Sequence, residues 1–366
     1  MPEFNTRQMN VIKANDKNIL CLATASSGKT ATLVGRISRL ISEGVDPEYI
    51  VAFTFTRQAA QEMHKRLGEK GKKMFIGTIH AYANLICQIG GLSTLEDIAK
   101  ERFDDLIKKA MTINIGLYPR VDYLFVDEFQ DTDLIQYNFI KAIPAVNRFY
   151  TGDERQFIYS FRNTSDKFIR ELATDSNFKK YYLTQNYRNP PNILRYADGY
   201  LGSLKKISPP SIPMIEKDGF LDTHCKFTDA VEEMTWTKDW TGWVVLCRSN
   251  TEVEIAQKML NEKDVLNVIV KRGDLDNEAM ENILHENRVK IMTIHAAKGL
   301  EFPNVVVVGT AVYSEEERRI CYVAATRAKE ALYWCPTIKT TKGKSKNSQH
   351  KANIIFNKTN LESITF

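Results

Sequence analysis

The sequence has no long hydrophobic run. No apolar stretch approaches the ~18 consecutive residues that a membrane-spanning helix requires. The first residues, Met1 to Thr6, include neither the basic nor the apolar part of a secretory signal. We therefore expect a cytoplasmic protein that makes no contact with a membrane.

Cysteine is scarce, and its spacing argues against the common metal motifs. The six cysteines lie far apart with no C-x-x-C pair, and the six histidines show no H-x-x-x-H spacing, so zinc and iron–sulfur sites are not expected. Low-complexity tracts and fixed-period repeats are also absent, which excludes solenoid architectures. The composition is that of a globular protein, with 43% hydrophobic and 26% charged residues, and the length of 366 residues suits two domains.

A large excess of one charge is absent too. The formal net charge of +5 is compatible with a polyanionic partner but is also common among proteins that bind none. The densest basic stretch, residues 339–351, is expected to be a solvated tail segment that makes at most weak phosphate contacts. Charge alone therefore does not decide the function.

Short β-rich runs alternate with helical patterns from residue 19 onward. Strands are predicted at 19–23, 50–54, 123–126, 148–151, 243–247, 289–293 and 305–308. Apolar residues repeat with helical spacing after several of these strands, for example over 33–41. This rhythm predicts an α/β protein with two parallel sheets and flanking helices, which we divide into domains 1–183 and 184–366.

A phosphate-binding loop is predicted between the first strand and the helix that follows it. The segment ends in the G-K-T of a P-loop, and its position between a strand and a helix supports the motif. The residues expected around the phosphates are Ala25, Ser26, Ser27, Gly28, Lys29 and Thr30. Lys29 adds a positive charge and the Thr30 hydroxyl can bind Mg²⁺. Ala23 stands where the strict pattern has glycine, and Thr24 and Ser26 add no further glycine, so a positive φ in this loop would be strained.

A pair of carboxylates is expected to complete this site. Asp127 and Glu128 follow the apolar strand 123–126, at the sheet edge where ligands of open α/β sheets bind. Asp127 can hold Mg²⁺, and Glu128 can orient and deprotonate a water that attacks the terminal phosphate. A chance G-K-T is the alternative for the loop alone, but ATP hydrolysis is the most economical explanation of loop and carboxylates together.

At residues 126–131, V-D-E-F-Q-D, the chain closely resembles the UvrD/Rep-type DNA helicases of superfamily 1. The likeness continues in the family's order over residues 5–8, 53–60, 77–80, 150–162, 185–188, 293–302 and 316–328. The resemblance implies two RecA-like domains, with ATP and Mg²⁺ bound in the cleft between them.

The resemblance also assigns residues to the nucleotide. Gln8 would read the adenine, Tyr187 would stack on it, and Glu301 would contact the ribose. The residues that would face the γ-phosphate are Gln156, Arg188 and Arg327, the last as the second arginine finger. We further place Arg36, on the helix after the loop, in the nucleotide site.

A track for single-stranded DNA is implied by the same resemblance. The residues assigned to it are Phe55, Thr56, His80, Tyr159, Phe161, Arg162 and His295. Aromatic side chains in loops can stack on bases of any sequence. Packing in the core stays the alternative for the three aromatic residues among them.

Departures from the family pattern favour a bare two-domain motor. Only residues 81–122 and 189–288 separate the motifs between which large family members carry inserted domains. Ala31 stands where the family often has arginine, Phe161 where it usually has tryptophan, and Arg57-Gln58 where it has Asn-Lys.

Several functions remain open at this point. The leading one is an ATP-dependent, monomeric motor that moves 3′ to 5′ on single-stranded DNA and unwinds duplexes at single-strand/duplex junctions, with the polarity taken from the resemblance. The second is a translocase or protein-displacing clamp that does not open duplexes, or needs a protein partner for processivity. The third is an accessory nucleic-acid-binding subunit with a degraded ATP site, which the intact set of ATP-site residues disfavours. An RNA-directed motor is a further alternative.

Overall fold

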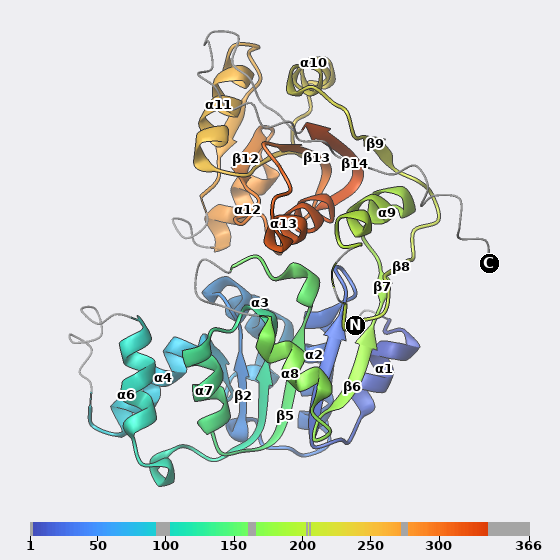
Figure 1. Ribbon diagram of the computed structural model, residues 1–366. Helices are drawn as coiled ribbons and strands as arrows, with labels where there is room; N and C mark the ends of the chain where they lie inside the picture. The colour runs from blue at the N-terminus through green and yellow to red at the C-terminus, as the bar shows by residue number, and fades with distance from the viewer. Residues whose placement is uncertain are drawn as a thin grey trace.

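Two parallel β-sheets, one in each half of the molecule, organise the chain (Figure 1). The computed structural model describes residues 3–92, 103–159, 166–202, 204, 206–271 and 277–335. All the strand pairings within both large sheets are parallel. The predicted fold class, two parallel-sheet α/β domains of the RecA-like type, is confirmed.

The first sheet has six strands in the order β3-β2-β4-β5-β1-β6. Their bounds are Ile50–Phe53 (β2), Phe75–Gly77 (β3), Val121–Val126 (β4), Ala145–Gly152 (β5), Asn18–Ala23 (β1) and Lys179–Leu183 (β6). The central strand β1 is buried from Ile19 to Ala23, as expected for a near-continuous apolar run covered on both faces. Strand β5 is longer than the predicted 148–151, because its pairing with β4 starts at Ala145 and its pairing with β1 reaches Gly152.

Helices cover both faces of the first sheet. Their bounds are Thr6–Lys13 (α1), Lys29–Ser42 (α2), Arg57–Leu67 (α3), Ile79–Ile89 (α4), Phe103–Thr112 (α6), Leu134–Ala142 (α7) and Lys167–Thr174 (α8). One core contains residues of α1, α2 and α3, among them Val11, Leu33 and Met63. The other contains residues of the remaining helices, among them Tyr82 and Phe139. Helices α7 and α8 lie in front of the sheet in Figure 1.

The second sheet has the order β11-β12-β10-β13-β14-β9. Its strands are Asn267–Ile269 (β11), Val289–Thr293 (β12), Trp243–Cys247 (β10), Phe302–Val308 (β13), Ala328–Cys335 (β14) and Phe220–Asp222 (β9). Its helices are Pro191–Tyr200 (α9), Phe227–Thr237 (α10), Asn250–Asn261 (α11), Asn277–His285 (α12) and Glu315–Ala325 (α13). Side chains of α9, α12 and α13 fill the core on one face, and those of α10 and α11 fill the core on the other.

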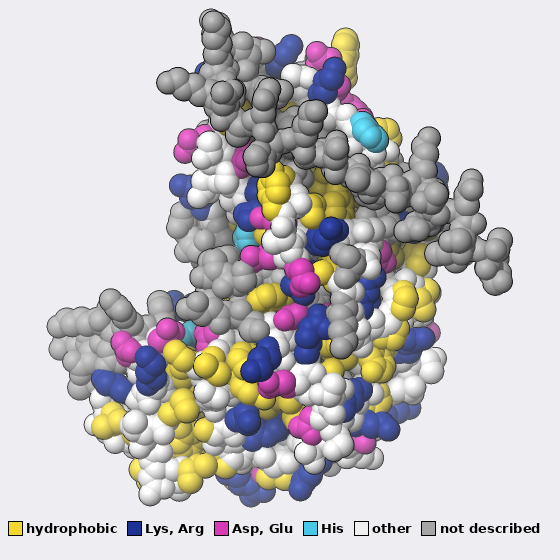
Figure 2. Space-filling model, viewed as in Figure 1, with side chains coloured by type: hydrophobic (Ala, Val, Ile, Leu, Met, Phe, Trp, Pro, Cys, Tyr) yellow, Lys and Arg dark blue, Asp and Glu magenta, His cyan; other side chains and the backbone are white. Residues whose placement is uncertain are grey.

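The two halves are joined by more than one crossing of the chain. Strand β7 (Gln185–Asn186) leaves the first sheet and pairs with β8 (Ile212–Pro213), a segment that returns from α9. Next to β8, the buried Glu154 side chain accepts hydrogen bonds from the backbone of Ile207 and Ser208. Charged side chains of both signs gather where the halves meet (Figure 2). Since the chain crosses repeatedly, the boundary between residues 183 and 184 stays a proposal.

The packing of the cores predicts that two leucines contribute very differently to stability. Leu20 is fully buried in β1, whereas Leu134 at the start of α7 is 56% exposed. We expect Leu20→Ala to lower the free energy of unfolding of the first domain by about 2–5 kcal/mol. Leu134→Ala should cost far less, because little apolar surface leaves the core. Calorimetric melting of both variants checks this, and equal destabilisation would contradict the packing described.

Candidate functional site

The phosphate-binding loop lies between β1 and α2. Gly28 caps the amino end of α2 with a left-handed φ of 79°, and Ser26 also has a positive φ of 57°. The loop therefore does hold the strained conformation expected from its lack of further glycines. The Ser27 hydroxyl donates to Thr24 O at 2.8 Å, and Thr24 N donates to Leu183 O at 2.9 Å. These contacts hold the loop so that the first N–H groups of α2 point toward a bound anion.

Gln8 supports this loop from α1. Its side-chain Nε2 donates to Ser27 O at 3.0 Å, and its Oε1 accepts from Asn5 N in a capping box. A Cβ at Gly28 would lie 2.5 Å from Gln8 Nε2, so only glycine allows this approach. The residue assigned to adenine recognition thus also fixes the loop that would hold the phosphates.

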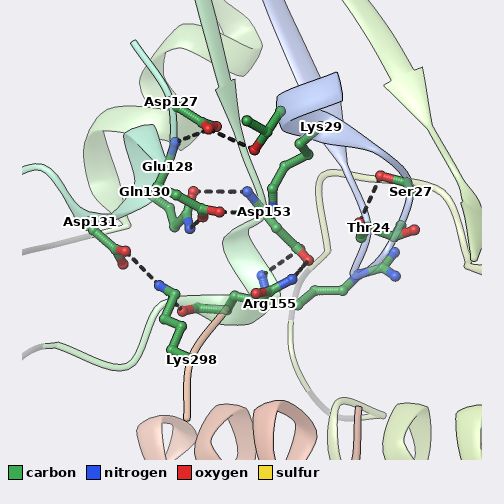
Figure 3. A network of polar contacts seen from close by, with 12 residues as sticks. Thr24, Ser27, Lys29, Asp127, Glu128, Gln130, Asp131, Asp153, Arg155 and Lys298 are labelled. Carbon is green, nitrogen blue, oxygen red and sulfur yellow. Dashed lines mark hydrogen bonds and ion pairs between the residues drawn. The ribbon is translucent and has the colours of Figure 1, made fainter. Parts of the chain in front are cut away.

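The two carboxylates meet the loop at the carboxyl end of β4, as expected (Figure 3). The Thr30 hydroxyl donates to Asp127 Oδ2 at 2.9 Å, and Lys29 Nζ lies 3.5 Å from Glu128 Oε1. Glu128 has a left-handed φ of 51°, a backbone conformation that non-glycine residues rarely adopt and that often marks a functional position.

The pKa values of these two buried carboxylates shift in opposite directions. Desolvation, followed by the neighbouring Glu128 charge, raises the pKa of Asp127 to about 6, although Lys29 and the Thr30 hydroxyl oppose the rise. Desolvation also opposes ionisation of Glu128, but the ammonium groups of Lys29 and Lys298 outweigh it and lower the pKa of Glu128. Glu128 is therefore charged and able to accept a proton, whereas Asp127 has a poorly compensated charge.

The residues around Asp127 fit a magnesium ion. A divalent cation would stabilise the charged form of Asp127, and hydroxyl and carboxylate oxygens are hard donors of the kind Mg²⁺ prefers. Within the described part of the chain, no three His, Cys, Asp or Glu side chains form a group that could hold a metal. Mg²⁺ needs no such group, because it is usually held by one or two carboxylates together with substrate phosphates.

A polar network extends from the carboxylates to the turn after β5. Gln130 Nε2 donates to Glu128 Oε2 at 2.5 Å, and Gln130 Oε1 accepts from Asp153 N at 2.9 Å. Gln156 Nε2 donates to Asp153 Oδ2 at 2.8 Å, so its amide contacts a neighbouring carboxylate rather than an open cleft. A γ-phosphate contact by Gln156 would require this bond to exchange.

The two arginines come from the second half of the molecule. Arg188 pairs with Glu301 at 2.7 Å and donates to Thr326 O at 3.0 Å. Arg327 is 2% exposed and donates to Val323 O and Leu300 O, both at 3.0 Å. Burial and then the Arg188 charge lower the pKa of Arg327 to about 9, with Glu128 among the groups that oppose this. Arg327 and Glu128 thus lie close enough for the charge of one to affect the pKa of the other. They face each other across the surface where the two halves meet, which we call the seam.

The expected adenine end is formed by both halves. Tyr187 is 46% exposed, and its hydroxyl accepts from Asn5 Nδ2 at 2.5 Å. Tyr187 N donates to Ser26 O at 3.2 Å, which places this exposed ring beside the phosphate loop. Glu301, assigned to the ribose, pairs with Arg188 and with Lys329.

The structure corrects the placement of Arg36. Its guanidinium is 3% exposed and donates to Val11 O at 2.8 Å and to Ala14 O at 2.7 Å. It also lies over the Phe149 ring, 5.5 Å from the centroid. Arg36 therefore anchors the carboxyl end of α1 to the sheet, and its assignment to the nucleotide was wrong.

Three of the residues assigned to the single strand are brought together. The rings of Phe55 and Tyr159 stack with centroids 5.4 Å apart, and the His295 ring lies 5.8 Å from Tyr159. His295 Nε2 is 3.0 Å from Ile158 O, which links the halves. Tyr159 is only 6% exposed, whereas Phe55 is half-buried, so Phe55 is the more accessible of the two rings for a base.

The other four residues assigned to single-stranded DNA either lie outside this stack or fall outside the described residues. The Thr56 hydroxyl accepts from Ala59 N and caps α3. His80 lies in the first turn of α4, and burial lowers its pKa against the opposing charges of Asp133 and Asp104. Phe161 and Arg162 lie outside the described residues.

Sequence reasoning missed the groups that join the two halves. Asp131, Asp153 and Lys298 are buried members of the polar network, and no local pattern distinguished them from ordinary motif neighbours. Their charge was the only local signal. None of the helices in the described ranges has the length and apolar character to cross a membrane.

Comparisons with known proteins agree with this geometry. A family model described as the UvrD/REP helicase N-terminal domain matches residues 4–94 and 94–177, and one described as the UvrD-like helicase C-terminal domain matches residues 240–337. A Mycoplasma pneumoniae protein named "Probable DNA helicase" is 24% identical, over 91% of this chain and 83% of its own length.

Two further relatives are longer than this chain. The ATP-dependent DNA helicase PcrA of Staphylococcus epidermidis is 28% identical over 53% of this chain and 39% of its own length. The ATP-dependent DNA helicase Rep of Buchnera aphidicola is 26% identical over 55% and 45%, respectively. The chain thus spans less than half the length of these two relatives.

The raised pKa of Asp127 predicts a pH-dependent metal effect. Above a pH of about 6 the buried carboxylate is charged and destabilises the free protein, and Mg²⁺ relieves this cost; below it, the carboxylate is protonated and the metal must displace a proton. We expect the rise in melting temperature caused by Mg²⁺ with a non-hydrolysable ATP analogue to shrink as the pH falls through about 6.

The matched control is Asp127→Asn. This variant has no titrating carboxyl group at position 127, so only the protonation of the nucleotide itself still changes with pH. Its Mg²⁺-dependent rise should be smaller and should vary less with pH. An identical pH dependence in both proteins would contradict the assignment of Asp127 to the metal.

Proposed function

The chain belongs to the UvrD/Rep family of helicases, and we propose that it uses ATP hydrolysis to move 3′ to 5′ along single-stranded DNA and to unwind duplexes. One observation carries the proposal: Lys29 and Glu128 of the first half lie in the same polar seam as Arg327 of the second. A nucleotide bound there would touch groups from both halves. The direction of movement rests on the family resemblance.

Hydrolysis is assigned to residues of both halves. The amino end of α2 and Lys29 would hold the phosphates, and the charged Glu128 would accept a proton from the attacking water. Thr30 and Asp127 would hold Mg²⁺, which neutralises phosphate charge when bound. Arg188 and Arg327 would stabilise the charge that develops on the γ-phosphate.

Closure of the two halves would couple this chemistry to movement. In the structure Arg188 is paired with Glu301, and Arg327 is held by backbone carbonyls of its own half. A triphosphate offers these guanidinium groups stronger, doubly charged partners, so its binding favours approach of the halves. Loss of the γ-phosphate reverses that preference, and alternate closing and opening moves the strand along Phe55, Tyr159 and His295.

A second candidate is a translocase or protein-displacing clamp that does not open duplexes. It is favoured by the short segments 81–122 and 189–288, which leave little chain for the inserted domains of large family members. We place either activity in the cytoplasm, carried out by a monomer on single strands and single-strand/duplex junctions, with a protein partner as a source of processivity. An accessory role without ATP turnover is disfavoured, because the Lys29, Thr30, Asp127 and Glu128 constellation is intact.

One experiment separates the candidates. ATP hydrolysis is measured with and without single-stranded DNA, alongside unwinding of duplexes with 3′ or 5′ tails. Stimulated hydrolysis with unwinding of the 3′-tailed duplex supports the helicase. Stimulated hydrolysis with neither duplex opened supports the translocase, and no hydrolysis under any condition refutes both.

Two substitutions test the catalytic assignment. Lys29→Ala and Glu128→Gln should each lower kcat by about 100-fold or more, because phosphate stabilisation or the proton acceptor is lost. Binding of a labelled oligonucleotide should change little, since neither residue belongs to the strand track. Glu69→Gln, on an exposed side chain that pairs with Lys72, is the matched control. Unaltered turnover in either site variant would refute its assigned role.

A further inference from the structure

Lys298 reaches from the second half of the molecule into the first. It lies in the turn between β12 and β13, yet its Nζ is 2.5 Å from Asp131 Oδ2 and 3.0 Å from Gln156 O (Figure 3). Both partners belong to turns at the carboxyl edge of the first sheet. This contact joins residues 167 positions apart in the sequence, and it exists only while the halves are together.

The ion pair is almost completely removed from water. The side chains of Lys298 and Asp131 are 7% and 1% exposed, and the other carboxylate oxygen of Asp131, Oδ1, is buried without a hydrogen-bond partner. A buried pair stabilises little by itself, but removal of one partner leaves a charge whose desolvation is not compensated. Separation of the halves must therefore hydrate both groups, so the pair reports whether the seam is closed.

Asp131 is connected to the proposed catalytic carboxylate through one short turn. The 3₁₀ turn η4 (Phe129–Asp131) starts directly after Glu128. Between them, the Gln130 side chain bridges Glu128 Oε2 and Asp153 N. A Cβ at Gly152 would lie 2.6 Å from Gln130 Oε1, so Gln130 is tightly held in this bridging position. A displacement of Asp131 would therefore move Glu128 as well.

The Lys298 ammonium also touches the proposed DNA side. Lys298 Nζ lies 5.0 Å from the centroid of the Tyr159 ring, whose neighbour in the stack is Phe55. A cation this close to an aromatic face is attracted to it. A base that stacks on the half-buried Phe55 would therefore act on the surroundings of Lys298 through the Tyr159 ring.

We propose that Lys298 is a positioning residue that links strand binding to hydrolysis: only in the closed seam does it hold the Asp131 turn, and with it Glu128, in the arrangement that accepts a proton. This inference rests on the proposed ATPase function. It gives a route by which DNA bound near Phe55 and Tyr159 changes the rate of ATP hydrolysis, although neither residue belongs to the ATP site.

The test compares the full-length wild type with Lys298→Met, Asp131→Asn and the double variant. For each, kcat and KM for ATP are measured with and without oligothymidylate. Lys298→Met should reduce the stimulation of kcat by DNA about 10-fold, the size of a direct pairwise coupling, with a much smaller change in KM. Lys298→Arg, which keeps the charge, should recover part of this loss.

The double variant carries the sharper expectation. Lys298→Met and Asp131→Asn should each lower the DNA-stimulated kcat while KM for ATP changes little. The double variant should lower it no further than the larger of the two single losses, because both residues act through one contact. Residues that only support the fold would give additive losses, and melting curves with Lys263→Met, an exposed lysine of the second half, control for general destabilisation.

The outcomes are distinguishable from failure of the proposed function. A wild type without DNA-stimulated hydrolysis refutes the function and this inference with it. A stimulated wild type with equal stimulation in Lys298→Met, or with additive losses in the double variant, refutes only the role of Lys298. Reduced stimulation with little change in KM and no further loss in the double variant supports it, even if Lys298→Met melts at a lower temperature, because general destabilisation would add up in the double variant.

Discussion

The burial of several carboxylates at one edge of the first sheet is the constraint on which the rest of the structure depends. Asp127, Glu128, Asp131 and Asp153 all lie where β4 and β5 end, and such charges are costly to remove from water without cationic partners. The first half supplies Lys29, and the second half supplies Lys298 and Arg327. The opposite charges at the seam therefore compensate each other. A nucleotide bound there with its cation would change this balance of charge.

The crossings of the chain give this seam a defined geometry. Glu154 accepts hydrogen bonds from Ile207 and Ser208, and Arg155 donates to Ser208 O at 3.2 Å and to Ser211 Oγ at 2.9 Å. Both charged residues are 2% exposed. The segment that returns from α9 is thus fastened to the turn that also carries Asp153 and Gln156. This attachment lies beside Gln156, one of the residues proposed to contact the γ-phosphate.

A compact chain concentrates several roles in few residues. Gln8 supports the phosphate loop while lying next to the exposed Tyr187 ring through its cap partner Asn5. The Tyr159 ring packs against Phe55 on the proposed strand track and against the Lys298 ammonium of the ion pair. In both cases one side chain contacts groups of two proposed sites, so these sites share residues.

Local patterns in the sequence were sufficient for most of the inner strands of the two sheets, the phosphate loop and the Asp127–Glu128 pair. The four edge strands β3, β6, β9 and β11, and β14 beside β9, were not predicted. Burial on both faces demands continuous apolar strands, and phosphate chemistry demands a short loop with G-K-T before a helix, so both leave a signature within a few neighbouring residues. The bounds of β5 needed the structure, because they depend on its pairing partners.

Only the tertiary structure decided what long-range packing controls. It turned Arg36 toward the carbonyls of α1, buried Tyr159 under Phe55, and brought Lys298 to Asp131. A lysine or arginine has the same local sequence signature whether it faces solvent, a phosphate or a buried carboxylate. Its partner is fixed by how two separately folded sheets dock, and that free energy is spread over contacts far apart in the chain.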